Sequence, residues 1–176
     1  MCVICVKPAG RRLPEDHELR AMYEANPDGC GFATANRFFK SLDFEEFLTE
    51  IHKVNISEPC IIHFRWATHG SVNVKNCHPF YDQESNTYFA HNGILGIRPV
   101  GDMTDSETAF RTALAPCIRD YGISSRVFKT EVGRIIGYSK FAFIQDGRVY
   151  TFGHFERLDG LLYSNLRWFG MVSGWY

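Results

Sequence analysis

The apolar residues of this chain are gathered in short runs, and this pattern limits the fold more than any other feature. The run from Val3 to Val6 is typical, since it lasts only a few residues and is rich in β-branched side chains. A membrane-spanning helix needs about 20 consecutive apolar residues, so no such helix is expected. Short apolar runs bounded by turn residues are instead typical of β-strands. We therefore expect short strands that alternate with a few helices.

Turn signals divide these runs into strands and hairpins. Asp146-Gly147 is a strong signal for a two-residue hairpin turn, and it separates the apolar segments 141–144 and 149–152. The full set of predicted strands is 2–6, 32–35, 60–67, 87–90, 94–97, 141–144, 149–152, 161–163 and 168–172.

Three segments have the periodicity of amphipathic helices: 15–25, 43–54 and 105–121. The second is the clearest, because its apolar residues recur at the i, i+3, i+4 and i+7 spacing that places them on one helix face. These residues are Phe44, Phe47, Leu48, Ile51 and Val54. In the third helix we expect Pro116 to cause a kink and Gly122 to end the helix.

Hairpins accompanied by segregated helices indicate an α+β fold with antiparallel sheets rather than a doubly wound parallel sheet. The 176 residues fit a single domain and show neither an internal repeat nor a linker. A chain of this length buries about 70% of the surface that it exposes when unfolded, so it can form its own core. We therefore expect one α+β domain over residues 1–176.

Charge and cysteine content exclude several functional classes. With 19 basic and 20 acidic residues the formal net charge is −1, so no extended field attracts nucleic acid or an anionic membrane. The first residues lack the basic and apolar regions of a secretory signal. Without such a signal, six cysteines are better interpreted as reduced thiols than as a disulfide scaffold. We expect a cytoplasmic protein with no nucleic-acid or membrane partner.

Four features could carry chemistry, and each also has an ordinary structural explanation. Cys2 could be no more than a small residue near a terminus. Arg65 interrupts an apolar strand, and a structural salt bridge would also explain it. Asn92-Gly93 is the commonest type I′ turn signature between two strands. Asp105 lies in residues 104–107, which have the pattern of a capping box for the third helix.

These four features belong to an ordered series of motifs. After Cys2 the series is H-F-R-W-A-T-H-G over His63–Gly70, N-C-H-P-F over Asn76–Phe80, then His91-Asn92-Gly93, then Asp105-Ser106-Glu107. The series closely resembles the class II glutamine amidotransferases, which are N-terminal-nucleophile (Ntn) hydrolases that begin with a mature cysteine. The motifs cover about residues 2–110, and the rest matches only in its strand-rich character. The chain departs from the pattern at residues 25–31, which lack an arginine that many members carry. The resemblance implies a four-layer αββα sandwich.

The resemblance also implies an activity and a role for each candidate residue. The activity is hydrolysis of the side-chain amide of L-glutamine to glutamate and ammonia. Cys2 is implied as the nucleophile that forms a thioester, with its own α-amine, of ordinary pKa near ~8, as the base. Asn92 and the Gly93 amide are implied as the oxyanion hole. Arg65 is implied to bind the substrate α-carboxylate, and Asp105 the α-ammonium group. Trp66, Thr68 and His69 match pocket-lining positions, and no cofactor or metal is implied.

The implied mechanism depends on the first residue. Methionine aminopeptidases remove Met1 when a small residue such as cysteine follows, so we expect the mature chain to begin at Cys2. Retention of Met1 would block the α-amine and abolish the mechanism. The 176 residues leave room for a glutaminase but not for a synthase as well. We therefore expect the ammonia to pass to a partner synthase in trans, unless the chain acts as a free amidohydrolase.

Three alternatives remain open. The chain could be a related Ntn amidohydrolase that acts on another amide, or a binding module that keeps the fold without turnover. It could also be a structural zinc protein, because Cys2 and Cys5 form a C-x-x-C pair and Cys60 and His63 a C-x-x-H pair, with Cys77-His78 nearby. The zinc site is disfavoured because residues i and i+3 of an extended strand point to opposite faces.

Overall fold

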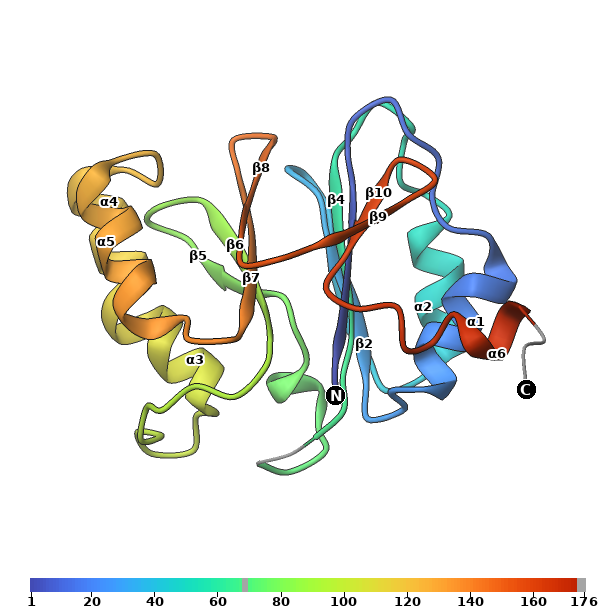
Figure 1. Cartoon of the computed structure of the whole chain (residues 1–176), viewed down its shortest axis with the longest axis horizontal. Coiled ribbons are helices and arrows are strands. Elements are labelled where there is room, and N and C mark those ends of the chain that lie inside the picture. The colour runs from blue at the N-terminus through green and yellow to red at the C-terminus, as the bar shows by residue number, and fades with distance from the viewer. Residues whose placement is uncertain (68–69, 174–176) are drawn as a thin grey trace.

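Two antiparallel β-sheets lie face to face in the computed structural model, which describes residues 1–67 and 70–173 (Figure 1). One sheet has six strands in the order β3-β2-β4-β1-β10-β9, and the other has four in the order β5-β6-β7-β8. The strand bounds are β1 Val3–Lys7, β2 Cys30–Ala33, β3 Phe38–Ser41, β4 Cys60–Phe64, β5 Phe80–Asp82, β6 Thr87–Asn92, β7 Lys140–Gln145, β8 Arg148–Phe152, β9 Glu156–Leu158 and β10 Leu161–Tyr163.

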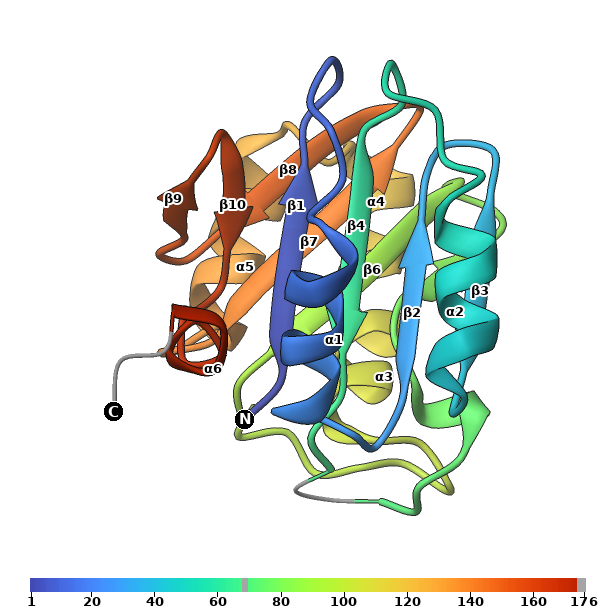
Figure 2. The ribbon, with the colours of Figure 1, turned by 90° about the vertical axis from the view of Figure 1, so that its right-hand side faces the viewer.

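Helices cover the outer face of each sheet, so the layers run helix, sheet, sheet, helix (Figure 1, Figure 2). Outside the six-stranded sheet lie α1 (Asp16–Glu24) and α2 (Phe44–Ile51), with α6 (Gly170–Ser173) near α1. Outside the four-stranded sheet lie α3 (Asp105–Ala109), the π-helical turn η2 (Phe110–Leu114), α4 (Ala115–Tyr121) and α5 (Arg126–Ile135). A short 3₁₀ turn, η1, covers Val74–Asn76. The predicted α+β fold and its αββα layers are confirmed.

Strand β1 shows why its first four residues, 3–6, are all apolar rather than alternating. Val3 and Cys5 pack into the cluster beneath α1 and α2, whereas Ile4 and Val6 pack against the facing sheet. Because both faces of the strand are covered, neither set of side chains can be polar without losing solvation. The Ala142 side chain of β7 meets this inner layer from the other sheet.

Helix α2 forms where the periodicity predicts it and begins at a clear cap. The Asp43 carboxylate accepts hydrogen bonds from the backbone N–H groups of Glu45 and Glu46, at 2.7 and 3.0 Å. Such caps satisfy backbone donors that have no partner inside the helix. Phe44, Phe47 and Ile51 are buried against the six-stranded sheet.

The predicted helix over residues 105–121 is continuous but changes its winding. The π-helical turn η2 stands directly before Pro116, which has no N–H and whose ring crowds the carbonyl four residues earlier. The wider winding of the preceding turn accommodates the proline. Gly122, with φ of 81°, ends the helix as predicted.

The hairpin predicted around Asn92-Gly93 is wrong. Residues 94–97 form no strand, and β6 pairs instead with β5 and β7. Gly93 has a φ of 141°, which lies outside the left-handed range of a type I′ turn. The Leu95 N–H donates to the Asp105 carboxylate rather than to a neighbouring strand. In contrast, Asp146-Gly147, with φ of 49° and 72°, forms the predicted turn between β7 and β8.

Other predicted boundaries also change. The strand predicted over 168–172 is wrong, because fully buried Trp168 packs on Tyr163 and the chain then enters α6. Strand β4 ends at Phe64, so Arg65 follows the strand instead of interrupting it. Strands β3, β5 and β9 and helix α5 were not predicted. Within the described residues, no helix is both long and apolar enough to cross a membrane.

Candidate active site

Strands from both sheets end at one edge of the sandwich, and the residues at or just beyond their ends meet there. Val3 of β1 pairs with Phe64 of β4, which places Cys2 beside Arg65. Strand β6 of the facing sheet ends at Asn92, and the N-terminus lies at the same end of the space between the sheets (Figure 1). Residues that are far apart in the sequence are thus brought together by the strand register.

A small polar pocket with about 350 Å³ of empty volume lies at this edge. Five of the predicted site residues line it, namely Cys2, Arg65, Trp66, Gly93 and Asp105. The remaining lining residues are Ala67, Asn76, His78, His91, Thr104 and Ser106. Predicted residues Thr68 and His69 lie outside the described residues. Asn92 is adjacent to the pocket but is not among the residues that line it.

The Cys2 thiol is held by the backbone of Trp66. Its Sγ accepts a hydrogen bond from the Trp66 N–H (3.3 Å) and donates to the Trp66 carbonyl oxygen (3.5 Å). The Cys2 carbonyl accepts from Asn165 Nδ2 at 2.9 Å. Burial raises the pKa of the thiol, while the Trp66 hydrogen bond and the Arg65 charge oppose this shift. The resting group is therefore a thiol, and it needs a base before it can act as a nucleophile.

The segment that carries Arg65 is fixed by Asp28, which the sequence did not identify as a site residue. Asp28 Oδ2 accepts from the Ala67 N–H at 2.7 Å, and the Asp28 N–H donates to the Arg65 carbonyl at 3.0 Å. The Arg65 N–H donates to the Gly29 carbonyl at 2.7 Å. Arg65 itself is 4% exposed, and its Nη1 donates to the Ser71 carbonyl. These bonds hold a buried guanidinium at the pocket wall.

Asn92 and Gly93 lie side by side but face different surroundings. Asn92 Nδ2 donates to Ser164 Oγ at 2.8 Å, and the same oxygen accepts from the Ile4 N–H at 2.8 Å. One amide hydrogen of Asn92 is therefore used inside the sandwich, and the second remains for another acceptor. A side chain at Gly93 would place its Cβ 2.2 Å from Ser139 Oγ, so the position requires glycine.

Asp105 is free to face the pocket because Thr104 caps helix α3. Thr104 Oγ1 accepts from the Glu107 N–H at 3.1 Å, so Thr104 caps the helix and Asp105 is not needed for this role. The Asp105 carboxylate instead accepts from the Leu95 and Ser106 N–H groups, at 2.9 and 2.8 Å. A carboxylate in the first turn of a helix is further stabilised by the helix dipole. Asp105 thus presents an oriented negative charge to the pocket that Arg65 also lines.

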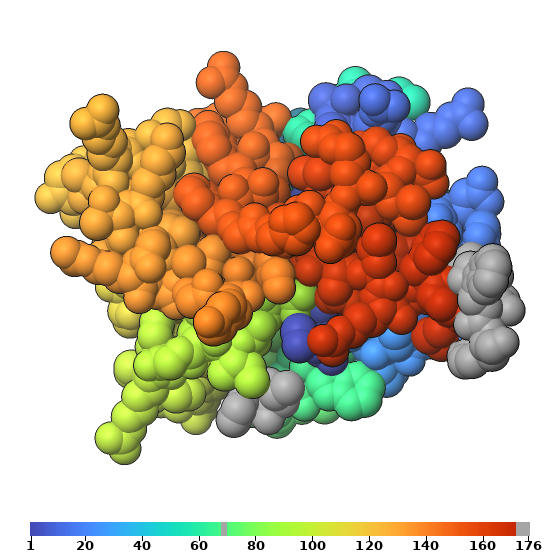
Figure 3. Space-filling model, viewed as in Figure 1, coloured from blue at the N-terminus to red at the C-terminus, as the bar shows by residue number. Residues whose placement is uncertain are grey.

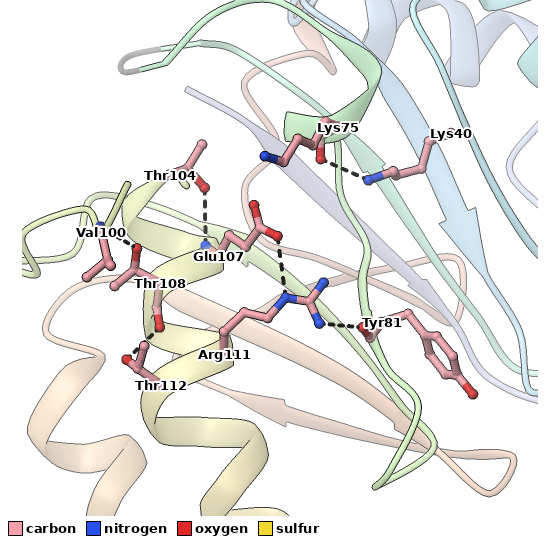
Figure 4. Close-up of polar contacts among 9 residues, drawn as sticks. All are labelled: Lys40, Lys75, Tyr81, Val100, Thr104, Glu107, Thr108, Arg111 and Thr112. Atoms are coloured by element: carbon pink, nitrogen blue, oxygen red, sulfur yellow. Dashed lines mark hydrogen bonds and ion pairs between the residues drawn. The ribbon is translucent and has the colours of Figure 1, made fainter. Parts of the chain in front are cut away.

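Further contacts anchor helix α3 to its neighbours (Figure 4). The Val100 N–H donates to Thr108 Oγ1 at 3.1 Å, which fastens the preceding loop. Arg111 Nη1 donates to the Tyr81 carbonyl of β5 at 2.8 Å, and its Nε lies 3.4 Å from Glu107 Oε1. The helix is therefore fixed to the four-stranded sheet independently of the pocket.

Three buried histidines lie beside and beneath the pocket. The ring centroids of His63 and His78 are 4.3 Å apart, and those of His78 and His91 are 6.4 Å apart. Burial lowers the pKa of His63 to about 3 and that of His91 to about 4, and it lowers the pKa of His78 well below 6.5. All three are therefore neutral at pH 7. They occur in the sequence motifs, but no role could be assigned to them from the motifs alone.

A second, larger pocket adjoins the first at Cys2. It has about 1120 Å³ of empty volume and shares Cys2, Trp66 and Gly93 with the small pocket. Met1, Ile94 and Tyr138 give it an apolar wall. Trp66, which lines both pockets, is 46% exposed.

The cysteine and histidine pairs do not converge on a metal site in the described part of the chain. Cys5 and Cys60 are buried in the cluster under the helices, away from Cys2 in the pocket. Over residues 1–67 and 70–173, no group of three or more His, Cys, Asp and Glu side chains is arranged to hold a metal ion. The geometry thus gives the zinc alternative no support there.

Comparison with known proteins agrees with the motifs. The family model of the class-II glutamine amidotransferases matches residues 44–148, which is more than half of the chain. A glutamine–fructose-6-phosphate aminotransferase (isomerizing) from Methanococcus maripaludis is 37% identical over 73 residues, covering 39% of this chain and 12% of that protein. A putative glutamine amidotransferase from Haemophilus influenzae is 44% identical over 61 residues, covering 28% of this chain and 20% of that protein. The matched segments are thus a small part of each relative.

The fold is also similar to solved structures. The glutamine phosphoribosylpyrophosphate amidotransferase from B. subtilis superposes with a TM-score of 0.64 at 18% sequence identity. The superposition covers 98% of this chain and 44% of that one. It supports the αββα fold, while the family model and the motif series carry the assignment. The chain belongs to the class II glutamine amidotransferases.

Proposed function

We propose that this chain hydrolyses the side-chain amide of L-glutamine, with Cys2 as the nucleophile. The observation that carries the proposal is that the Cys2 thiol, the Arg65 guanidinium and the Asp105 carboxylate line one small pocket. An amino acid substrate carries an α-carboxylate and an α-ammonium group. The planar guanidinium suits the carboxylate, and the oriented carboxylate suits the ammonium group. A pocket with one charge of each sign is adapted to a small zwitterion.

The reaction needs a base for the Cys2 thiol, and we assign this role to the α-amine of Cys2 after Met1 is removed. Met1 is 49% exposed, and the start of the chain, dark blue in Figure 3, reaches the surface between the orange, yellow-green and red segments. An aminopeptidase can therefore approach it. A free α-amine has a pKa near ~8, so at neutral pH its unprotonated form can accept the thiol proton.

The bonds that form and break follow from this assignment. The thiolate attacks the amide carbon, and the negative charge develops on the amide oxygen. We assign its stabilisation to the Gly93 N–H and to the second amide hydrogen of Asn92. The protonated amine then gives its proton to the leaving nitrogen, which departs as ammonia and leaves a thioester on Cys2. Water attacks the thioester, and glutamate is released with the thiol restored.

We further propose that the ammonia passes to an acceptor in a partner synthase. The larger pocket supports this route, because it opens directly beside Cys2 and carries apolar side chains at its wall.

All six cysteines are free, which suits a chain that works in the reducing cytoplasm.

The test measures ammonia release from L-glutamine by the full chain and by two cysteine variants, together with the intact mass of each protein. We expect activity in a chain that begins at Cys2, and loss to background in Cys2→Ala. The matched control is Cys117→Ala, which removes a half-buried thiol on α4 away from the pocket and should retain full activity. Ammonia release by Cys2→Ala at the wild-type rate, or hydrolysis of another amide but not of glutamine, would contradict the proposal.

A further inference from the structure

Asp105 stands at the end of a series of polar contacts that reaches into the interior. His91 Nδ1 lies 2.7 Å from Ser106 Oγ, and Ser106 Oγ lies 3.2 Å from Asp105 Oδ1. All three residues line the small pocket. His91 and Ser106 are only 2% and 5% exposed. The series therefore connects β6 in the sheet to the first turn of α3, inside the protein.

The chemistry of these groups determines which atom donates. A carboxylate only accepts hydrogen bonds, so the Ser106 hydroxyl donates to Asp105. The Ser106 oxygen can then accept from His91, which must carry its proton on Nδ1. Burial lowers the pKa of His91 to about 4, although the Asp105 charge opposes this shift. The ring is thus neutral at pH 7, with Nδ1 protonated and Nε2 unprotonated.

An imidazole at this position costs free energy that an apolar side chain would not. Nε2 of His91 is buried and has no hydrogen-bond partner among the described residues. A buried polar atom without a partner is destabilising. Two of the neighbouring rings are apolar, since Phe141 packs edge-on at 5.5 Å and Phe89 lies on the same face of β6. The hydrogen bond between Nδ1 of His91 and the Ser106 hydroxyl offsets the cost of burying the other ring nitrogen.

We propose that His91 and Ser106 are positioning residues that hold the Asp105 carboxylate in the orientation that binds the α-ammonium group of the substrate. This inference rests on the proposed function. Each carboxylate oxygen already accepts one backbone N–H, and the Ser106 hydroxyl adds a third contact that restricts rotation of the group. Helix α3 itself is held by Thr104, Thr108 and Arg111 (Figure 4). Removing the hydroxyl should therefore free the carboxylate without releasing the helix.

The test compares kcat/KM for L-glutamine with kcat/KM for glutaramate, the same γ-amide without the α-ammonium group. We expect Ser106→Ala to lower kcat/KM for glutamine about tenfold more than for glutaramate, mainly through KM. His91→Leu should similarly reduce the preference for glutamine over glutaramate. His91→Asn should restore most of it, because the asparagine amide can donate from a position close to that of Nδ1.

A matched serine and a double variant separate positioning from general damage. Ser125→Ala removes a hydroxyl that caps α5, where it accepts from the Phe128 N–H at 3.0 Å, and it should leave the preference unchanged. In an Asp105→Asn background, Ser106→Ala should change the preference no further. Equal losses for both amides in Ser106→Ala, or a further loss in the double variant, would overturn the inference.

The outcomes also separate this inference from the proposed function. If the wild-type protein releases ammonia from neither amide, the proposed function fails and the inference fails with it. If the wild-type protein uses glutamine but Ser106→Ala keeps the full preference, the inference alone fails. Correlation of ring protons with ¹⁵N in His91 gives a readout that does not need turnover. A proton on Nε2 instead of Nδ1 at pH 7 would contradict the proposed direction of the hydrogen bonds.

Discussion

The three buried histidines make the stability of this fold depend on pH with a predictable sign. In the folded chain the pKa of His63 is about 3 and that of His91 about 4, and that of His78 lies well below 6.5. In an unfolded chain a histidine has a pKa near ~6.5. As the pH falls below this value, the unfolded chain binds protons that the folded chain does not. The free energy of unfolding is therefore highest above pH ~6.5 and falls towards pH ~4.

The size of the effect follows from the number of histidines. Each proton bound only by the unfolded chain lowers the free energy of unfolding by about 1.4 kcal/mol per pH unit. Between pH 7 and pH 5 one such histidine lowers the free energy of unfolding by up to about 2 kcal/mol, and three lower it by up to about 6 kcal/mol. This sum is comparable with the whole stability of a typical domain, about 5–15 kcal/mol. We therefore expect the protein to be marginally stable or unfolded near pH 5.

The assay is urea unfolding, followed by tryptophan fluorescence at pH values from 5 to 8, for the wild type and His78→Phe. The variant keeps a ring between His63 and Phe80, whose ring centroids lie 4.3 and 4.5 Å from that of His78. It removes one titrating group, so the fall between pH 7 and pH 5 should shrink by up to about 2 kcal/mol. Equal falls in both proteins, or a wild-type fall below about 2 kcal/mol, would refute the reasoning.

The remaining predictions concern the pocket. Arg65→Lys replaces a planar fork by a point charge, so KM for glutamine should rise about tenfold with kcat nearly unchanged; a fall in kcat alone would contradict the assignment. Asn92→Ala should instead lower kcat by about 10²–10³, and an effect on KM alone would remove Asn92 from the oxyanion hole. Gly93→Ala forces Cβ to within 2.2 Å of Ser139 Oγ at a φ of +141°. This variant should lower the free energy of unfolding, measured with urea, by at least about 2 kcal/mol. The control Gly10→Ala, whose Cβ meets nothing within 4 Å, should lower it by about 1 kcal/mol.

The sequence was informative where one periodicity decides the local structure. Helix α2 has its apolar side chains on one face, so its existence could be predicted, and it lies within the predicted range 43–54. Strand β3 could not, because its four residues show no clear alternation and only Ser41 among them is buried. Residues 94–97 were misassigned because Asn92-Gly93 has the composition of a hairpin turn, whereas the Asp105 carboxylate, distant in the sequence, takes the Leu95 N–H.

In the site, the residues within motifs could be predicted, whereas the residues that hold them through tertiary contacts could not. Cys2, Arg65, Gly93 and Asp105 could be selected from the motif series, and the structure brings them to one pocket. The residues that fix them could not be selected. Asp28 acts on Ala67 across 39 positions of the sequence, and Ser164 acts on Asn92 across 72. Such pairs exist only once the sheets are assembled, and a single sequence carries no signal of them.

The proposed function requires Cys2 to be an N-terminal nucleophile in a glutamine pocket. Its most direct test is to treat the full chain with a diazo-ketone analogue of glutamine and to determine the intact mass and the modified peptide. We expect a chain that begins at Cys2 and carries one adduct, on the Cys2 sulfur, with L-glutamine protecting against the reaction. An adduct on another residue, labelling of a chain that still begins with Met1, or no labelling at all would contradict it.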